Sequence, residues 1–125
     1  MKKTFHFPRL RNSFFYACEG IYYAFVHDHN LRIHFFAALL VIIASIFFRV
    51  SAFEMGILGV MILLVISTEM INSAIEKMVD LITTEHRQEA KIAKDVSAGM
   101  VLLTAIGSVI VGILIFVPYL MKFFW

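Results

Sequence analysis

Four polar residues recur at helical spacing along one long apolar segment, and their types suit proton transfer. They are Glu69, Asn72, Glu76 and Asp80. Intervals of three and four residues place them on one face of an α-helix. Glu69 is the only formally charged residue between positions 55 and 75, and a carboxylate at the edge of a bilayer core is a functional-site hypothesis by default. The pattern predicts proton abstraction at a membrane surface, beside a bound metal ion.

A second group of charges stands just before the last apolar segment. Lys94 and Asp95 precede an uncharged run that begins at residue 96, and Lys91 lies three residues upstream of Lys94. A lysine in this place can meet a phosphate as a point charge, and the aspartate can hold that lysine or a metal. The alternative is a solvated loop whose charges merely flank the membrane.

A third polar cluster precedes the first apolar segment. Its histidines alternate with other polar residues, at His27, His29 and His34. We do not predict zinc there, because no cysteine is near and no third histidine is spaced for the same helix face. Asp28 can instead supply a hard oxygen ligand to Mg²⁺.

The whole composition indicates the class of protein that must position these groups. The 125 residues are 61% hydrophobic with a mean hydropathy of +0.86, which is more apolar surface than a soluble domain this small can bury. We therefore predict an all-α integral membrane protein with a single domain over residues 1–125. The net charge of +2 argues against a nucleic-acid partner. The sequence contains neither a P-loop nor a glycine-rich kinase loop.

Three segments can cross a bilayer, at about residues 31–49, 52–76 and 96–118. Pro118 is expected to loosen the last turn of the third. Residues 8–28 are expected to form an amphipathic helix lying on the membrane surface, although a helix packed on protein fits equally well. Its apolar face would carry Leu10, Phe14, Ala17, Cys18, Ile21 and Phe25.

Basic residues give the expected topology. Two regions rich in lysine and arginine precede the first span and separate the second from the third; they include Lys2, Lys3, Arg9, Arg11 and Arg32, then Lys77, Arg87, Lys91 and Lys94. The positive-inside rule places both regions in the cytoplasm. Because three helices leave little room to bury Glu69, and because Ser108 and Gly112 permit close helix approach, we also expect a homo-oligomer.

These residues alone leave the function open. Metal-assisted chemistry fits the acidic stripe and its basic neighbour. A small cation-coupled transporter with Glu69 as the proton or cation site also fits, but it predicts a carboxylate near mid-span and little need for charges at the cytoplasmic edge. A non-catalytic scaffold gives no reason for the stripe to coincide with the basic loop.

The stripe and its surroundings resemble a known family. The run from Glu69 to Asp80, EMINSAIEKMVD, is followed at family spacing by Ala93-Lys94-Asp95. Together with Gly20, Ala24-Phe25 and the Asn30-x-Arg32-x-His34 pattern, it is similar to the prokaryotic diacylglycerol kinase family, which includes undecaprenol kinases. The resemblance implies a homotrimer in the bacterial plasma membrane, with three spans and an N-terminal surface helix per subunit. It also implies active sites at subunit interfaces facing the cytoplasm, where the ATP γ-phosphoryl group passes to a lipid hydroxyl with Mg²⁺.

The resemblance also implies a role for each matching residue. Glu69 would be the general base and contact the lipid substrate, and Asn72 would orient Glu69 or the lipid hydroxyl. Asp28 and Glu76 would hold Mg²⁺. The implied ATP-binding residues are Arg9, Tyr16, Asp28, Glu76, Glu85, His86, Arg87, Lys94 and Asp95.

Two details of the resemblance concern specificity. The family usually has Glu where this chain has Asp28, which keeps the carboxylate but is one methylene shorter. The Asn30-x-Arg32-x-His34 pattern and the Val79–Ile82 continuation are more similar to undecaprenol kinases of Gram-positive bacteria. We therefore expect undecaprenol as substrate, with diacylglycerol as the alternative.

Overall fold

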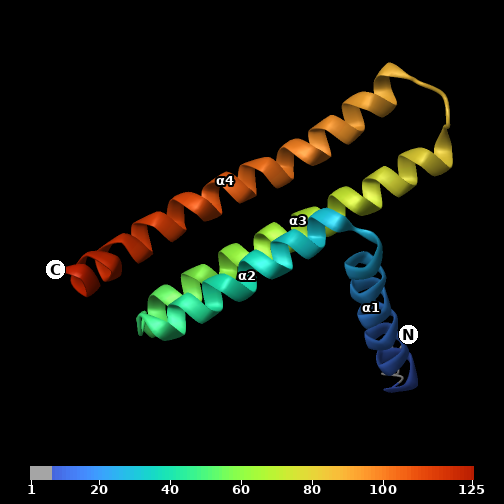
Figure 1. The fold of residues 1–125 in the computed structure, drawn as a ribbon. Coiled ribbons are helices and arrows are strands. Elements are labelled where there is room, and N and C mark those ends of the chain that lie inside the picture. The colour runs from blue at the N-terminus through green and yellow to red at the C-terminus, as the bar shows by residue number, and fades with distance from the viewer. Residues whose placement is uncertain (1–6) are drawn as a thin grey trace, which may run out of the picture.

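A computed structural model describes residues 7–125 as four α-helices joined by short turns (Figure 1). They are α1 (Phe7–His27), α2 (His29–Phe47), α3 (Ala52–Ile82) and α4 (Gln88–Phe124). Of these, α2, α3 and α4 are long and apolar enough to cross a membrane. This confirms the predicted all-α, multi-pass membrane architecture with three spans. Lys2 and Lys3, which entered the topology argument, lie outside the described residues.

Local signals in the sequence account for where the helices begin. The Asp28 carboxylate caps α2 by accepting a hydrogen bond of 3.2 Å from the backbone N–H of Leu31. Ser51 caps α3, and Glu54 completes a capping box by accepting from the Ser51 backbone N–H. Each cap satisfies backbone donors that the first helical turn leaves free.

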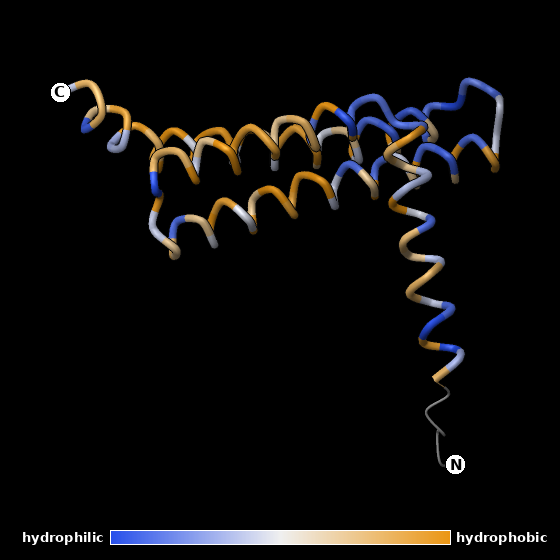
Figure 2. The backbone as a smooth tube through the Cα atoms, turned by 60° about the horizontal axis from the view of Figure 1, so that its bottom comes forward, coloured by the Kyte–Doolittle hydropathy of each residue, from blue (hydrophilic) through white to orange (hydrophobic). Residues whose placement is uncertain are grey.

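The helices α3 and α4 form a long antiparallel pair, and α2 packs along the other side of α3 (Figure 1). With 31 and 37 residues, α3 and α4 are about 45 and 55 Å long at 1.5 Å per residue. Both therefore extend beyond a hydrocarbon core of about 30 Å. Figure 2 shows hydrophilic residues gathered at the end of the bundle where α1 joins α2 and α3 joins α4.

The apolar core lies toward the opposite end of the bundle. Val50, Leu58 and Ile115 are buried together. Nearby, the Tyr119 hydroxyl of α4 donates a 2.5 Å hydrogen bond to Oε2 of Glu54, at the start of α3. These contacts hold the end of the α3–α4 pair that is remote from the polar residues.

The helices extend further than the sequence estimates of the spans. Helix α3 ends at Ile82 rather than near 76, and α4 begins at Gln88 rather than near 96, because the hydropathy estimate counts only residues that suit lipid. Helix α4 also continues through Pro118 to Phe124. A proline removes one backbone donor and crowds the carbonyl group four residues earlier, but it does not end α4.

The C-terminal end of α1 joins the bundle, and α1 runs across the direction of the other three helices (Figure 1). None of its residues is buried. It contacts the rest of the protein near His27, where the Tyr23 ring lies 5.2 Å from Lys77 Nζ. Its proposed place on a membrane surface is taken up below.

Candidate functional site

A polar pocket of about 400 Å³ opens where α1, α2 and α3 meet. Four residues of the predicted site line it together, namely Asp28, Glu69, Asn72 and Glu76. Burial decreases along α3, because Glu69 and Asn72 are buried whereas Glu76 is exposed. The acidic stripe therefore runs from the interior of the bundle toward water, as its sequence pattern predicts.

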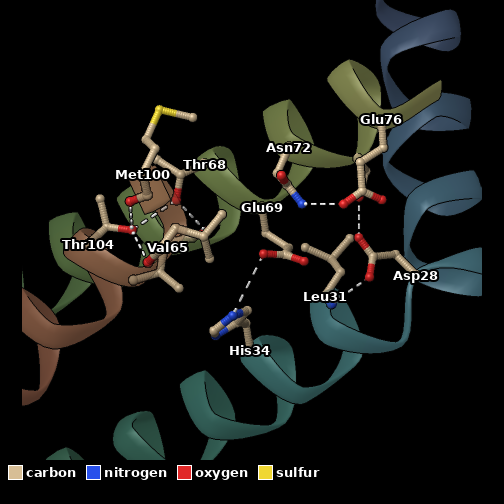
Figure 3. Close-up of polar contacts among 12 residues, drawn as sticks. Asp28, Leu31, His34, Val65, Thr68, Glu69, Asn72, Glu76, Met100 and Thr104 are labelled. Carbon is tan, nitrogen blue, oxygen red and sulfur yellow. Dashed lines mark hydrogen bonds and ion pairs between the residues drawn. The ribbon is translucent and has the colours of Figure 1, made fainter. Parts of the chain in front are cut away.

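Glu69 points from α3 toward α2 (Figure 3). It is 2% exposed, and its Oε2 lies 4.0 Å from Nε2 of His34. The fully buried Leu31 occupies the same interface. The sequence argument for an oligomer assumed that three helices leave too little room to bury Glu69 well. That assumption is wrong, because α2 covers Glu69 within one chain.

Asp28 is held from two sides. One carboxylate oxygen caps α2, and the other accepts a hydrogen bond from the Ser73 hydroxyl of α3. A single carboxylate thus fixes the start of α2 against α3, next to Glu76. Its two bonds explain why a short side chain suits this position, since the N-cap geometry favours Asp.

Asn72 links α3 to α4. Its Nδ2 donates a 3.2 Å hydrogen bond to Oε1 of Glu76 (Figure 3). Its Oδ1 accepts a 2.7 Å hydrogen bond from the hydroxyl of Ser97 on α4. The family resemblance suggested that Asn72 orients Glu69 or the lipid hydroxyl, whereas in the structure its protein partners are Glu76 and Ser97.

A second polar pocket, of about 500 Å³, lies between the end of α3 and the start of α4. It contains the other group of predicted residues, Glu85, His86, Arg87, Lys94 and Asp95. Lys94 Nζ lies 2.6 Å from Asp80 Oδ1. Asp80 lines both pockets, so the acidic stripe and the basic group adjoin at this residue.

The remaining ion pairs in this region differ from those suggested by sequence proximity. Asp95 pairs with Lys91 at 2.5 Å rather than with its neighbour Lys94. Arg87 pairs with Glu85 at 3.1 Å. All four side chains are largely exposed, so these pairs can open readily toward a ligand.

Two predicted residues do not reach either pocket within one chain. Arg9 and Tyr16 lie on α1, away from the bundle, and Tyr16 is 65% exposed. A site that uses them needs α1 of another subunit or a different placement of α1.

The carboxylates suit a metal that also binds a substrate. Within residues 7–125, no three His, Cys, Asp or Glu side chains lie close enough to hold a metal by themselves. Mg²⁺ commonly takes one or two protein carboxylates and completes its shell with water and phosphate oxygens. Asp28 and Glu76, which line one pocket from two elements, fit that donor set.

An apolar pocket of about 220 Å³ adjoins this region, lined by α2, α3 and α4. His34 is one of the residues that line this pocket, and the Nε2 atom of the His34 ring faces Glu69. The apolar pocket and the buried carboxylate therefore meet at His34.

Sequence reasoning missed two hydroxyls of the site. Ser73 lies within the EMINSAIE run, next to Asn72, and bonds to Asp28. Ser97 is a polar residue inside an apolar helix and is 3% exposed. Its place three residues after Lys94, on the same helical face, is the sequence signal that could have indicated it.

Comparisons with known proteins agree on one family. Residues 15–116 match the family model described as prokaryotic diacylglycerol kinase. The chain is 43% identical over 116 residues to a diacylglycerol kinase of Synechocystis, covering 92% of this chain and 66% of that protein. It is 40% identical over 112 residues to an undecaprenol kinase of Bacillus subtilis, covering 90% and 91%. It is 31% identical over 107 residues to the diacylglycerol kinase of Escherichia coli K12, covering 86% and 88%.

Proposed function

Because this chain belongs to the prokaryotic diacylglycerol kinase family, we propose that it transfers the γ-phosphoryl group of ATP to the hydroxyl of a membrane lipid alcohol. The observation that carries the proposal is the position of Glu69. This buried carboxylate shares a pocket with Asp28 and Glu76, and that pocket adjoins the lysine-bearing pocket at Asp80. The residues proposed as proton acceptor, metal-binding pair and phosphate-binding cation thus line two adjoining pockets.

Glu69 acts in this proposal as the general base that takes the proton of the lipid hydroxyl. Its burial supports this role, because a carboxylate that is poorly hydrated is a better proton acceptor than one in water. Its position beside His34, which lines the apolar pocket, also supports the role. A lipid chain lying along α2 and α4 would bring its hydroxyl to Glu69.

Asp28 and Glu76 hold Mg²⁺ in this proposal, and the ion supplies charge neutralisation for the triphosphate. Lys94 provides a second positive charge for the phosphates. The residues Arg9, Tyr16, Glu85, His86, Arg87 and Asp95 complete the proposed nucleotide site. Positioning and charge stabilisation are most of what phosphoryl transfer requires.

The proposed assembly is a homotrimer with active sites between subunits and facing the cytoplasm. Two observations support an assembly. Arg9 and Tyr16 line neither polar pocket of their own chain. Moreover, Gly56 is exposed, and a Cβ atom added there would meet nothing within 4 Å, so another helix can approach closely at this position.

In this assembly α1 lies on the cytoplasmic surface of the membrane as an amphipathic helix. Its direction across the three spans (Figure 1) supports that placement. The whole of residues 1–125 is proposed to act as one membrane-embedded kinase domain, in the plasma membrane of a bacterium.

Undecaprenol is the proposed lipid, and diacylglycerol is the second candidate. The Asn30-x-Arg32-x-His34 pattern and the 40% identity to the Bacillus subtilis undecaprenol kinase favour undecaprenol. The 43% identity to a protein named diacylglycerol kinase favours the second candidate.

The test is a parallel assay of the purified protein with Mg·ATP and each lipid in the same detergent. Faster phosphorylation of undecaprenol supports the first candidate, and faster phosphorylation of diacylglycerol supports the second. Glu69→Gln should reduce turnover by at least about 100-fold, the usual contribution of a general base. Glu54→Gln, the same change at the other end of α3, is the matched control and should retain activity. Absence of phosphorylated lipid in both assays would refute the proposal.

A further inference from the structure

Ser97 faces the proposed active site from α4, behind Asn72. Its hydroxyl is 2.7 Å from Oδ1 of Asn72 and 2.9 Å from the backbone carbonyl oxygen of Lys94. It is 3% exposed, so water does not compete for these contacts. A buried hydroxyl on a membrane helix has a strong need for such partners.

Glu76 and Ser97 together fix which way the Asn72 amide points. One end of the amide must donate and the other must accept. An ionised Glu76 only accepts, so Asn72 has to turn its Nδ2 toward Glu76, as observed at 3.2 Å. The amide oxygen is then left in the buried interface between α3 and α4, where the Ser97 hydroxyl is its donor.

The opposite orientation of the amide is unfavourable. It would place the amide oxygen against the Glu76 carboxylate, with no proton between two acceptors. Removing the hydroxyl at position 97 would leave the observed orientation with an unsatisfied buried oxygen, which is also unfavourable. Ser97 therefore stabilises the orientation that an ionised Glu76 requires.

We propose that Ser97 is a positioning residue that acts through Asn72 to hold Glu76 in its metal-binding geometry. The role of Glu76 in this inference rests on the proposed function, whereas the orientation of the amide does not. The Ser97 oxygen also lies close to the backbone carbonyl oxygen of Lys94, but its single proton serves only one acceptor at a time, and the shorter distance is the one to Asn72.

The first experiment compares Ser97→Ala with Ser97→Cys and Ser45→Ala. Ser97→Ala should lower kcat and raise the Mg²⁺ concentration for half-maximal activity by about tenfold, the usual effect of losing a residue that orients a metal ligand. The KM for the lipid should not change. Ser97→Cys keeps a weak donor and should fall between wild type and Ser97→Ala. Ser45 is also buried and donates to Val41 O within its own helix, α2. It lines none of the three pockets described above, so Ser45→Ala should match wild type.

The second experiment measures the contacts of the Asn72 side-chain amide by NMR, without ATP or metal. The chain has asparagine only at positions 12, 30 and 72, so selective ¹⁵N-asparagine labelling gives three side-chain NH₂ signals by NMR. In wild type the Asn72 NH₂ protons should show nuclear Overhauser contacts to the Glu76 side chain. Ser97→Ala should shift or broaden this signal, and Ser45→Ala should leave it unchanged.

The two readouts together decide the inference. Asn72 NH₂ protons that contact Ser97 instead of Glu76 in wild type would overturn it. So would an activity loss in Ser97→Ala with an unchanged Asn72 signal, or a changed signal with normal kinetics. If Ser97→Ala does not fold, the wild-type contacts and Ser97→Cys give the answer. If no form of the protein phosphorylates either lipid, the proposed function fails separately, because the amide orientation is still measured.

Discussion

Nε2 of His34 on α2 lies 4.0 Å from Oε2 of Glu69 on α3 (Figure 3). Asn30, one helical turn earlier, lies near the same carboxylate. The spacing of four residues puts both side chains on one face of α2. Helix α2 therefore both buries Glu69 and presents polar groups to it.

His34 should matter for turnover because it limits how Glu69 can turn. We predict that His34→Leu, which removes the imidazole but keeps a side chain of moderate size, lowers kcat by about tenfold, since small displacements of a catalytic group are costly. His34→Gln retains a donor and should keep most of the activity. Steady-state kinetics with the preferred lipid tests this, and equal losses in the two variants would mean that only the shape of the ring matters.

Asp28 has two separable roles, which two substitutions distinguish. Asn caps helices about as well as Asp, so Asp28→Asn should preserve the thermal stability of the detergent-solubilised protein. Because it removes the negative charge, it should raise the Mg²⁺ concentration needed for activity by about tenfold. A normal Mg²⁺ requirement in this variant would rule out Asp28 as a metal ligand.

Asp28→Ala is the complementary variant. It removes both the cap and the acceptor of the Ser73 hydroxyl, so stability should fall by about 1 kcal/mol from the cap alone. Its Mg²⁺ requirement should rise as in Asp28→Asn. Unchanged stability in Asp28→Ala would show that the cap does not contribute to folding.

The stripe on α3 was the part of the site most readily predicted from sequence. Its members lie on one helix, so a period of 3.6 residues fixes their relative positions without any tertiary information. The composition of the spans likewise sufficed to predict three membrane helices, since hydropathy reflects the solvent around them. The family signature then gave each residue of the stripe an expected role.

Partners from other helices could not be predicted in the same way. Ser97 contacts Asn72 across 25 positions of sequence, and Ser73 contacts Asp28 across 45. Such contacts depend on how far each helix is rotated about its axis, which periodicity does not give. The same limitation led to the wrong inference that Glu69 needs a second subunit for burial, because the covering side of α2 carries no obvious signal.

Arg49 offers a test of the turn between α2 and α3. Its φ of 53° is in the left-handed region, which costs a residue with a Cβ atom about 1 kcal/mol. Arg49→Gly should therefore raise the thermal midpoint slightly, even after the greater flexibility of glycine in the unfolded chain is counted. Arg49→Ala keeps the Cβ and should give no gain. A lower midpoint for Arg49→Gly than for Arg49→Ala would contradict the argument.

Lys94 makes an ion pair in the free protein, and its proposed phosphate-binding role can be tested separately from that pair. Its Nζ is 2.6 Å from Asp80 Oδ1, but the two side chains are 39% and 65% exposed, and ion pairs this exposed contribute little to stability. Lys94→Met should therefore leave the thermal midpoint nearly unchanged. It should raise the KM for Mg·ATP by about tenfold, since a charge-assisted contact with phosphate is lost.

Asp80→Asn provides the matched control for Lys94→Met. It breaks the same ion pair but leaves the lysine free to meet phosphate, so the KM for Mg·ATP should stay the same or fall. Both values come from one ATP titration at saturating lipid and Mg²⁺. If Asp80→Asn raises the KM as much as Lys94→Met does, the ion pair itself shapes the nucleotide site, and the phosphate-binding role of Lys94 is wrong.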